Sequence, residues 1–271
     1  MESFLFILVL GLLGLCFGSF VNAAVWRIKN KKDLVNDRSE CTDCHHKLAW
    51  YDLIPVVSWV LLRGKCRYCG HAISIQYPLV ELALAIVFII SYLAWPYELQ
   101  AFADWSLFGL WLAASILLAI LFVYDMRWFL LPDKVMYPLI VLGGAMAIVK
   151  ALNSDQPAFA LLDAAVAVTI LSGLYLVLFL VSKGKWVGFG DVKLGLFLGL
   201  ALGESRLALF CLFLANILGC LLVVPGLLTG RIKRHSKVPF GPFLILGFLI
   251  SLLWGGDVLD WYLSLSFSAY M

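Results

Sequence analysis

The sequence predicts an all-α polytopic membrane protein of about eight transmembrane helices, with a small cytoplasmic zinc-binding insert after the first helix. Hydrophobic residues make up 63% of the 271-residue chain and charged residues only 14%, whereas a soluble domain is closer to half apolar and a quarter charged. Apolar segments recur along the chain, and most approach the ~20 residues that a spanning helix requires. One polar segment carries two Cys-x-x-Cys pairs, a spacing that is typical of zinc sites.

The expected membrane spans are the apolar segments 4–26, 78–95, 105–124, 135–149, 158–181, 186–203, 207–228 and 239–254. The fourth and sixth are short, and the tail 258–271 could either prolong the last span or lie at the interface. The first segment lacks a basic region before it and a small-residue cleavage site after it. We therefore expect a retained span there and not a removed signal peptide.

The distribution of Lys and Arg predicts the orientation of these spans. All of the 20 Lys and Arg residues except Lys150 and Arg206 fall on one side of the predicted topology. Such a bias marks the cytoplasmic side of a membrane protein. It sends both termini to the outside and places the polar segment 27–77 in the cytoplasm.

The polar segment 27–77 is too small to form a strong core without help. Its cysteine pairs can supply that help, because four thiolates form the tetrahedral set of a structural zinc site. Disulfides are the alternative, but they are rare on a cytoplasmic face, and a redox thiol pair would need a βαβ context that the sequence lacks. The expected zinc ligands are Cys41, Cys44, Cys66 and Cys69. A neighbouring histidine (His45, His46 or His71) could replace one cysteine, although solvated loop positions suit these histidines better.

Two acidic residues lie beside long apolar runs, and both fall on the cytoplasmic side of the predicted topology. Asp125 follows the run 105–124, and Asp191 closes the string Gly188-Phe189-Gly190-Asp191. Carboxylates at membrane depth are costly and therefore often functional. Two that face one another can share a proton and activate a water molecule, as aspartic proteases do. The alternative is structural, because an acidic residue at a helix end can cap the helix or pair with a lysine.

Glycines and prolines near the acids favour the catalytic interpretation. Gly188 and Gly190 would let a backbone approach closely beside Asp191, and unwinding in a membrane is tolerated only where protein or a water-filled cavity satisfies the backbone. Pro239 and Gly241 belong to a second such element on the same side, which could line the same cavity or simply begin a helix. Asp133, which follows Leu131-Pro132, is expected to cap the fourth span.

These residues resemble the GxGD intramembrane aspartic proteases and, more narrowly, the bacterial type IV prepilin peptidases. The resemblance covers nearly the whole chain, with the motifs in the family's order, and one departure is Thr42, where many members have proline. The matching segments are Gly18-Ser19-Phe20-Val21-Asn22, Tyr124-Asp125, Leu131-Pro132-Asp133, Gly188-Phe189-Gly190-Asp191, Pro239-Phe240-Gly241-Pro242 and the cytoplasmic block from Tyr51 to Glu81. The resemblance implies three parts: the first helix at 1–26, a putative methyltransferase insert at 27–77 and a peptidase core at 78–271.

The resemblance also implies the activity. The enzyme would remove the basic leader of prepilins or type II secretion pseudopilins at the cytoplasmic face of the bacterial inner membrane, with both termini periplasmic. It would then methylate the new N-terminal amine with S-adenosylmethionine. Gly64, Lys65 and Glu81 are the expected cofactor-binding residues, by resemblance alone, because the sequence has no Rossmann-type glycine motif after a strand. The lipid bilayer is the other expected partner, and no nucleic-acid partner is expected.

Other classes of protein share some of these features. A proton-coupled transporter with a zinc-stabilised regulatory insert would also place acids in the membrane, but we see no internal repeat of the kind that many transporters carry. Archaeal-type preflagellin peptidases and presenilin-like enzymes are disfavoured by the four-cysteine insert. A non-enzymatic scaffold would use Gly14-x-x-x-Gly18 as a helix-packing face.

Overall fold

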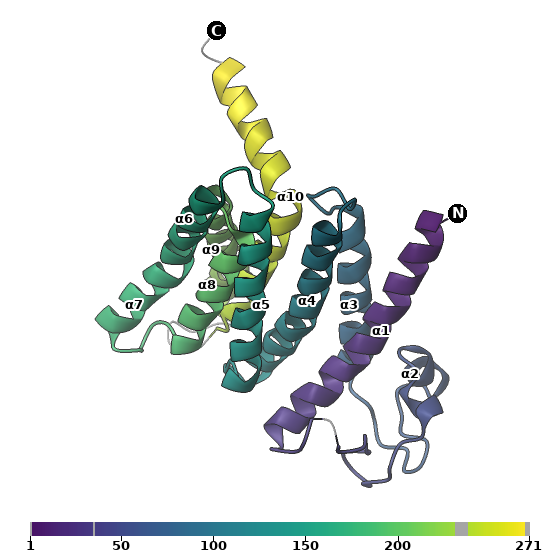
Figure 1. Ribbon diagram of the computed structural model, residues 1–271. Helices are drawn as coiled ribbons and strands as arrows, with labels where there is room; N and C mark the ends of the chain where they lie inside the picture. The colour runs from purple at the N-terminus through teal and green to yellow at the C-terminus, as the bar shows by residue number, and fades with distance from the viewer. Residues whose placement is uncertain (1, 35, 231–237, 269–271) are drawn as a thin grey trace. The chain divides into compact units, whose positions relative to one another are not determined.

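The computed structural model describes residues 2–34, 36–230 and 238–268, and these residues form helices and no strand, which confirms the all-α prediction (Figure 1). Only isolated β-bridges interrupt this pattern. The helical elements are α1 (Glu2–Lys29), η1 (Trp50–Leu53), α2 (Val57–Leu61), α3 (Gln76–Leu93), α4 (Phe102–Trp128), α5 (Asp133–Leu152), α6 (Pro157–Val168), η2 (Thr169–Gly173), α7 (Leu174–Ser182), α8 (Phe189–Leu202), α9 (Ser205–Leu228) and α10 (Gly241–Ser268).

Among the described residues, 7 helices are long and apolar enough to cross a membrane. One of them runs continuously through α6, the π-helical turn η2 and α7. The predicted sixth span is α8, which has only 14 residues because it begins after Gly188 and ends at Gly203 in the left-handed conformation. Residues 258–268 of the predicted tail are part of α10, which continues without a break to Ser268, and the last three residues lie outside the described ones. The chain is therefore a multi-pass membrane protein.

The chain divides into two compact units. The amino-terminal unit contains the residues up to Leu93 together with Ser115–Ile120, and the carboxy-terminal unit contains Ala94–Ala114 and the residues from Leu121 onward. In the amino-terminal unit, α1 packs along α3. A side chain at Gly14 or Gly18 would come within 2.5 Å of the Cα atom of Ala85 or Glu81, respectively. The predicted Gly14–Gly18 packing face is therefore used inside the chain, between α1 and α3.

Helix α8 is the central helix of the carboxy-terminal unit. It packs against α5, α6, α7, α9, α10 and η2, and buried residues follow one another along it from Val192 to Leu202. This enclosure explains why α8 is apolar on every face beyond Lys193. Two glycines one turn apart, Gly195 and Gly199, let the backbone of α6 and η2 pack closely against α8. A Cβ atom at Gly195 would lie 2.6 Å from the carbonyl oxygen of Leu171, and one at Gly199 would lie 2.5 Å from the Cα atom of Val168.

We expect Gly199→Ala to destabilise the folded protein, because the added methyl group would meet backbone that cannot move aside. Overpacking of this kind costs about 1–3 kcal/mol. The matched control is Gly144→Ala on α5, where a Cβ atom would meet nothing within 4 Å. The measurement is the thermal unfolding midpoint of both variants in the same detergent. Equal midpoints for Gly199→Ala and Gly144→Ala would contradict the close packing of α8.

Candidate active site and metal centre

Asp125 lies in the last turn of α4, and its side chain is buried. The residue is 5% exposed, and its Oδ2 atom accepts a hydrogen bond of 3.1 Å from the backbone N–H of Gly241 at the start of α10. A Cβ atom at Gly241 would lie 2.7 Å from the same oxygen. The absence of a side chain at Gly241 therefore lets the amino-terminal end of α10 approach the carboxylate directly.

Asp191 lies in the first turn of α8, where exposed backbone N–H groups favour a negative charge. Its Oδ2 atom accepts a hydrogen bond of 3.2 Å from the backbone N–H of Gly188, the residue that caps the helix. This bond matches the structural alternative, in which the acid caps the helix. A half-buried acid such as Asp191 can serve both purposes, because a single backbone donor leaves the second carboxylate oxygen available.

The backbone segments beside the two acids meet at Leu131. A Cβ atom at Gly190, next to Asp191, would lie 3.0 Å from the Cβ atom of Leu131, and one at Gly241 would lie 3.7 Å from Leu131 Cδ2. The carboxylates of Asp125 and Asp191 interact electrostatically. The carboxy-terminal unit thus joins the end of α4 with the starts of α8 and α10, and Pro239 lies in the segment that leads into α10.

An ion pair holds α5 beside α8 at this end of the unit. The predicted cap at Asp133 is wrong, because Pro132 is the capping residue of α5 and no side chain caps that helix. The carboxylate of Asp133 instead contacts the ammonium group of Lys193 at 2.6 Å. This ammonium group also lies over the rings of Tyr137 and Phe189. The sequence reasoning missed Lys193 as a partner, because only the fold brings residues 60 positions apart into contact.

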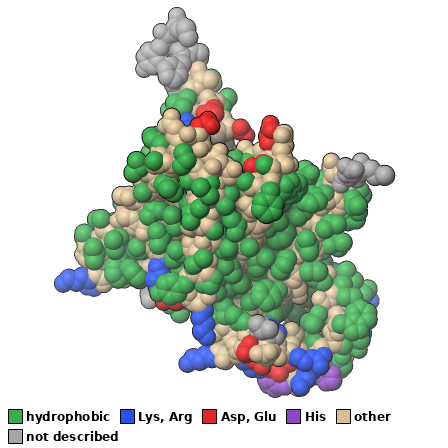
Figure 2. Space-filling view, in the orientation of Figure 1, with side chains coloured by type: hydrophobic (Ala, Val, Ile, Leu, Met, Phe, Trp, Pro, Cys, Tyr) green, Lys and Arg blue, Asp and Glu red, His purple; other side chains and the backbone are tan. Residues whose placement is uncertain are grey.

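Charge is distributed unevenly over the carboxy-terminal unit. Figure 2 shows Lys and Arg side chains toward its lower end, where α5 and α8 begin, and Asp and Glu side chains gathered at its upper end. The candidate site therefore lies at the basic end. Four basic residues that contributed to the predicted orientation, Arg231, Lys233, Arg234 and Lys237, lie outside the described residues.

The insert brings the four predicted zinc ligands together. The Sγ atoms of Cys41, Cys44, Cys66 and Cys69 all lie within 4.8 Å of one another. Four thiolates around one zinc ion at ~2.3 Å would be ~3.8 Å apart, so the cluster fits a tetrahedral site. The backbone forms two similar loops, in which Cys41 N–H bonds to the carbonyl oxygen of His46 and Cys66 N–H to that of His71.

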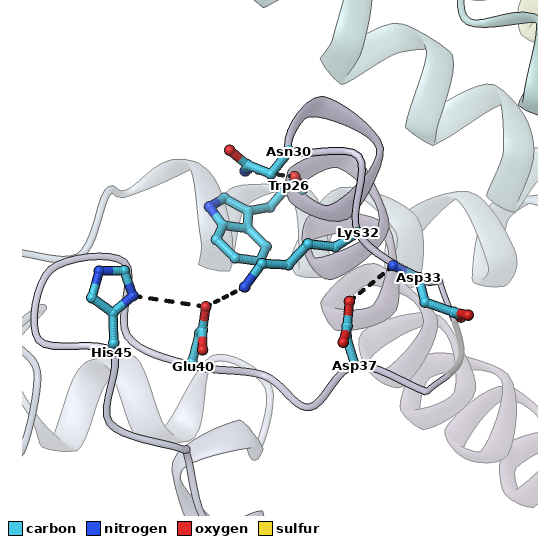
Figure 3. A network of polar contacts seen from close by, with 7 residues as sticks. All are labelled: Trp26, Asn30, Lys32, Asp33, Asp37, Glu40 and His45. Carbon is cyan, nitrogen blue, oxygen red and sulfur yellow. Dashed lines mark hydrogen bonds and ion pairs between the residues drawn. The ribbon is translucent and has the colours of Figure 1, made fainter.

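The neighbouring histidines have other contacts. His45 lies 3.8 Å from Glu40, which also pairs with Lys32 (Figure 3). His71 lies 3.7 Å from Asp43, and the ring of His46 lies 3.7 Å from that of Tyr68. The cluster of metal-ligating groups found among the described residues contains the four cysteines and no histidine.

A buried acid ties the insert's short helix to its second cysteine loop. Asp52 in η1 accepts a hydrogen bond of 2.7 Å from Arg67 Nε and one of 3.1 Å from the hydroxyl of Tyr68. Burial alone would raise the pKa of Asp52, but the hydrogen bonds from Arg67, the Ala49 N–H and Tyr68 hold that pKa below its usual value. Asp52 is therefore ionised at neutral pH and stabilises the second loop.

The residues expected to bind the methyl donor lie in the amino-terminal unit. Gly64 has a positive φ of 68°, and a Cβ atom there would lie 2.9 Å from the Trp59 ring, so a tight turn against the indole requires glycine. Lys65 is exposed and forms a β-bridge with Ala72. Glu81 is 6% exposed and accepts a hydrogen bond of 2.7 Å from the N–H of Val56. Glu81 thus links α3 to the start of α2.

Comparisons with known proteins agree with this architecture. The bacterial peptidase A24 N-terminal domain family matches residues 12–95, and the type IV leader peptidase family matches residues 112–224. A Bacillus subtilis (strain 168) protein named "Prepilin leader peptidase/N-methyltransferase" is 30% identical, over 95% of this chain and 98% of its own length. Proteins of the same name from Aeromonas salmonicida (strain A449) and Myxococcus xanthus (strain DK1622) are 34% and 35% identical, each over 86% of this chain and over 76% and 67% of their own lengths. No solved structure matches significantly.

Proposed function

This chain belongs to the type IV leader peptidase family, and we propose that it removes the leader of prepilins or pseudopilins and then methylates the new N-terminal amine. The relatives' name, prepilin leader peptidase/N-methyltransferase, supports both activities. The observation that carries the peptidase activity is that Gly190, next to Asp191, and Gly241, which donates to Asp125, both approach Leu131 at one end of the carboxy-terminal unit. The two carboxylates also interact electrostatically. We infer that these two carboxylates are the catalytic pair.

Cleavage by such a pair uses water as the nucleophile. Like charges at close range cannot both ionise easily, so the pair holds one proton and titrates as a unit. The ionised carboxylate takes a proton from the water, and the protonated one donates to the carbonyl oxygen of the scissile bond. The N–H groups of Gly241 and Gly188 orient the two side chains. No covalent acyl-enzyme forms.

The chemistry of a prepilin suits the basic end of the carboxy-terminal unit, where the candidate site lies. The apolar helix that follows a prepilin leader can lie in the bilayer beside the spans, which leaves the basic leader and the scissile bond at the membrane surface. Gly188 and Gly190 have no side chains to obstruct an extended peptide beside Asp191. Because the basic end of a membrane protein faces the cytoplasm, cleavage takes place on the cytoplasmic side of the inner membrane and both termini are periplasmic.

The cytoplasmic side of cleavage can be tested directly. The measurement is the release of the leader from a soluble peptide that spans the cleavage site, added to sealed membrane vesicles that contain the protein. Inside-out vesicles should cleave the peptide, and right-side-out vesicles should cleave it only after permeabilisation. Cleavage by intact right-side-out vesicles alone would contradict the orientation.

We propose that Cys41, Cys44, Cys66 and Cys69 hold a structural zinc ion that stabilises residues 27–77 as a separate insert between the helix 1–26 and the peptidase core 78–271. When bound, the ion supplies the cross-link that so small a segment lacks. S-adenosylmethionine is the expected methyl donor. The described part of the insert contains no βαβ unit, so a Rossmann-type site for the donor does not fit there. Gly64, Lys65 and Glu81 mark the region that we assign to methyl transfer.

The close contact at Gly241 makes a specific prediction. Gly241→Ala should lower leader cleavage by about 10- to 100-fold, because the added methyl group would displace the Asp125 carboxylate and misplaced catalytic groups lose rate steeply. The matched control is Gly256→Ala on the same helix, where a Cβ atom meets nothing within 4 Å. The measurement is the cleavage rate of purified variants at saturating substrate. Equal rates for both variants would argue against a role for the contact between Gly241 and Asp125.

A further inference from the structure

A buried hydroxyl beside the candidate site has no partner among the described residues. Tyr175 on α7 is 3% exposed, and its hydroxyl oxygen forms no hydrogen bond within the described part of the chain. Buried tyrosine hydroxyls are usually hydrogen-bonded, because an unpaired one loses its contacts with water and gains nothing. We therefore expect the Tyr175 hydroxyl to find a hydrogen-bond partner when substrate is bound.

The packing of α6, η2 and α7 against α8 places Tyr175 level with Asp191. The two segments run antiparallel, and their contacts advance by one turn at a time: Gly199 meets Val168, and Gly195 meets Leu171. One turn further along, position 191 is matched with position 175. Contacts on either side bracket this pair, since the Ser172 hydroxyl donates to the Val192 carbonyl at 2.9 Å and the rings of Phe179 and Phe189 lie 5.4 Å apart.

Tyr175 also contacts the start of α10, whose backbone binds the Asp125 carboxylate. Its ring lies 5.6 Å from that of Phe240, and the next residue, Gly241, donates its backbone N–H to the Asp125 carboxylate. Tyr175 and Asp191 interact electrostatically. Tyr175 thus contacts both α8, which carries Asp191, and the start of α10, which holds the Asp125 carboxylate.

We propose that Tyr175 is a positioning residue of the aspartate pair, and that its hydroxyl donates a hydrogen bond to the Asp191 carboxylate when water and substrate occupy the site. This proposal rests on the proposed peptidase function. A donor on one oxygen, together with the Gly188 N–H, holds the Asp191 side chain in one orientation. It also favours the ionised form of Asp191, so Asp191 takes the proton from the attacking water and Asp125 carries the shared proton.

Within the described residues, few other titratable groups contact Tyr175 or the two acids. Asp125 approaches from α4, and Cys211 on α9 interacts electrostatically with Tyr175. On α5 and α8, Asp133 and Lys193 are paired with one another. The acid pair and Tyr175 therefore dominate the pH dependence of cleavage.

The test is Tyr175→Phe, which removes only the hydroxyl. Measured with wild-type protein and a prepilin peptide, kcat should fall by about 10- to 100-fold, the effect expected for a hydrogen bond to a charged group. KM should change less than about 2-fold, because the bond acts on Asp191 and not on substrate binding. The acidic limb of the pH profile of kcat should move to higher pH, because the ionised form of Asp191 in the substrate complex has lost a donor.

Stability supplies a second readout that a merely structural tyrosine would not give. The thermal midpoint of Tyr175→Phe should equal or exceed that of the wild type, because an unpaired buried hydroxyl does not stabilise the resting protein. The matched control is Tyr97→Phe, whose ring packs on Trp95 outside the site and which should keep the wild-type rate and profile.

The outcomes separate this proposal from the function on which it rests. A wild type that does not cleave the peptide overturns both. A wild type that cleaves, with Tyr175→Phe showing wild-type kcat and pH profile, overturns the proposal for Tyr175 alone. A lower kcat with an unshifted acidic limb and a lower thermal midpoint also overturns it, since that pattern is the mark of a packing role.

Discussion

Asp125→Asn and Asp191→Asn should each reduce leader cleavage by about 1,000-fold or more, because neither amide can exchange a proton with the attacking water or the scissile carbonyl. Both variants should fold, since an asparagine side-chain oxygen can still accept from the Gly241 or Gly188 N–H. The measurement is the single-turnover cleavage rate of a prepilin by purified protein.

The control for this experiment is Asp155→Asn in the exposed loop between α5 and α6. It makes the same chemical change away from the site and should cleave at the wild-type rate. Methylation of a peptide that has already lost its leader should persist in all three variants. Substantial cleavage by either Asp125→Asn or Asp191→Asn would exclude the pair as the catalytic centre.

Removal of zinc should unfold the insert. Binding of a structural zinc ion by four cysteines contributes ~10–16 kcal/mol to folding in small zinc domains, and the insert has little core of its own: of the four ligands, only Cys66 is buried. We expect Cys66→Ser, or treatment with a strong chelator, to make the segment 27–77 sensitive to protease while the rest of the chain stays resistant.

The matched control for zinc is Cys220→Ser, an exposed cysteine on α9 outside the cluster. Metal analysis should find about one zinc ion per chain in the wild type and in Cys220→Ser, and none in Cys66→Ser. A metal-free insert that remains as protease-resistant as the wild type would show that zinc is not what folds it.

The sequence predicts the spans well because long apolar runs have few alternatives in a membrane. It predicts their ends less well, since packing decides them. The last predicted span ends at residue 254, yet α10 runs on through Gly255, Gly256 and Asp257. A Cβ atom at Gly255 would lie 2.8 Å from Leu207 on α9, so this glycine serves helix packing and not a turn.

The sequence also predicts the acid pair and the four cysteines, because charged residues beside apolar runs and paired cysteines are local signals. The ion pair of Lys193 with Asp133 and the position of Tyr175 opposite Asp191 each join residues that lie far apart in the sequence. Both depend on the antiparallel register of helices far apart in the chain, which Gly195 and Gly199 determine through close packing. A tyrosine within a long apolar helix gives no signal of its own.

The most direct test of the central claim is the N-terminal mass of a full-length prepilin after incubation with the purified protein, with and without S-adenosylmethionine. The account predicts loss of the leader under both conditions, and one added methyl group only when the donor is present. The same reaction with Asp191→Asn should leave the mass unchanged. An intact prepilin after incubation with folded wild-type protein would contradict the account.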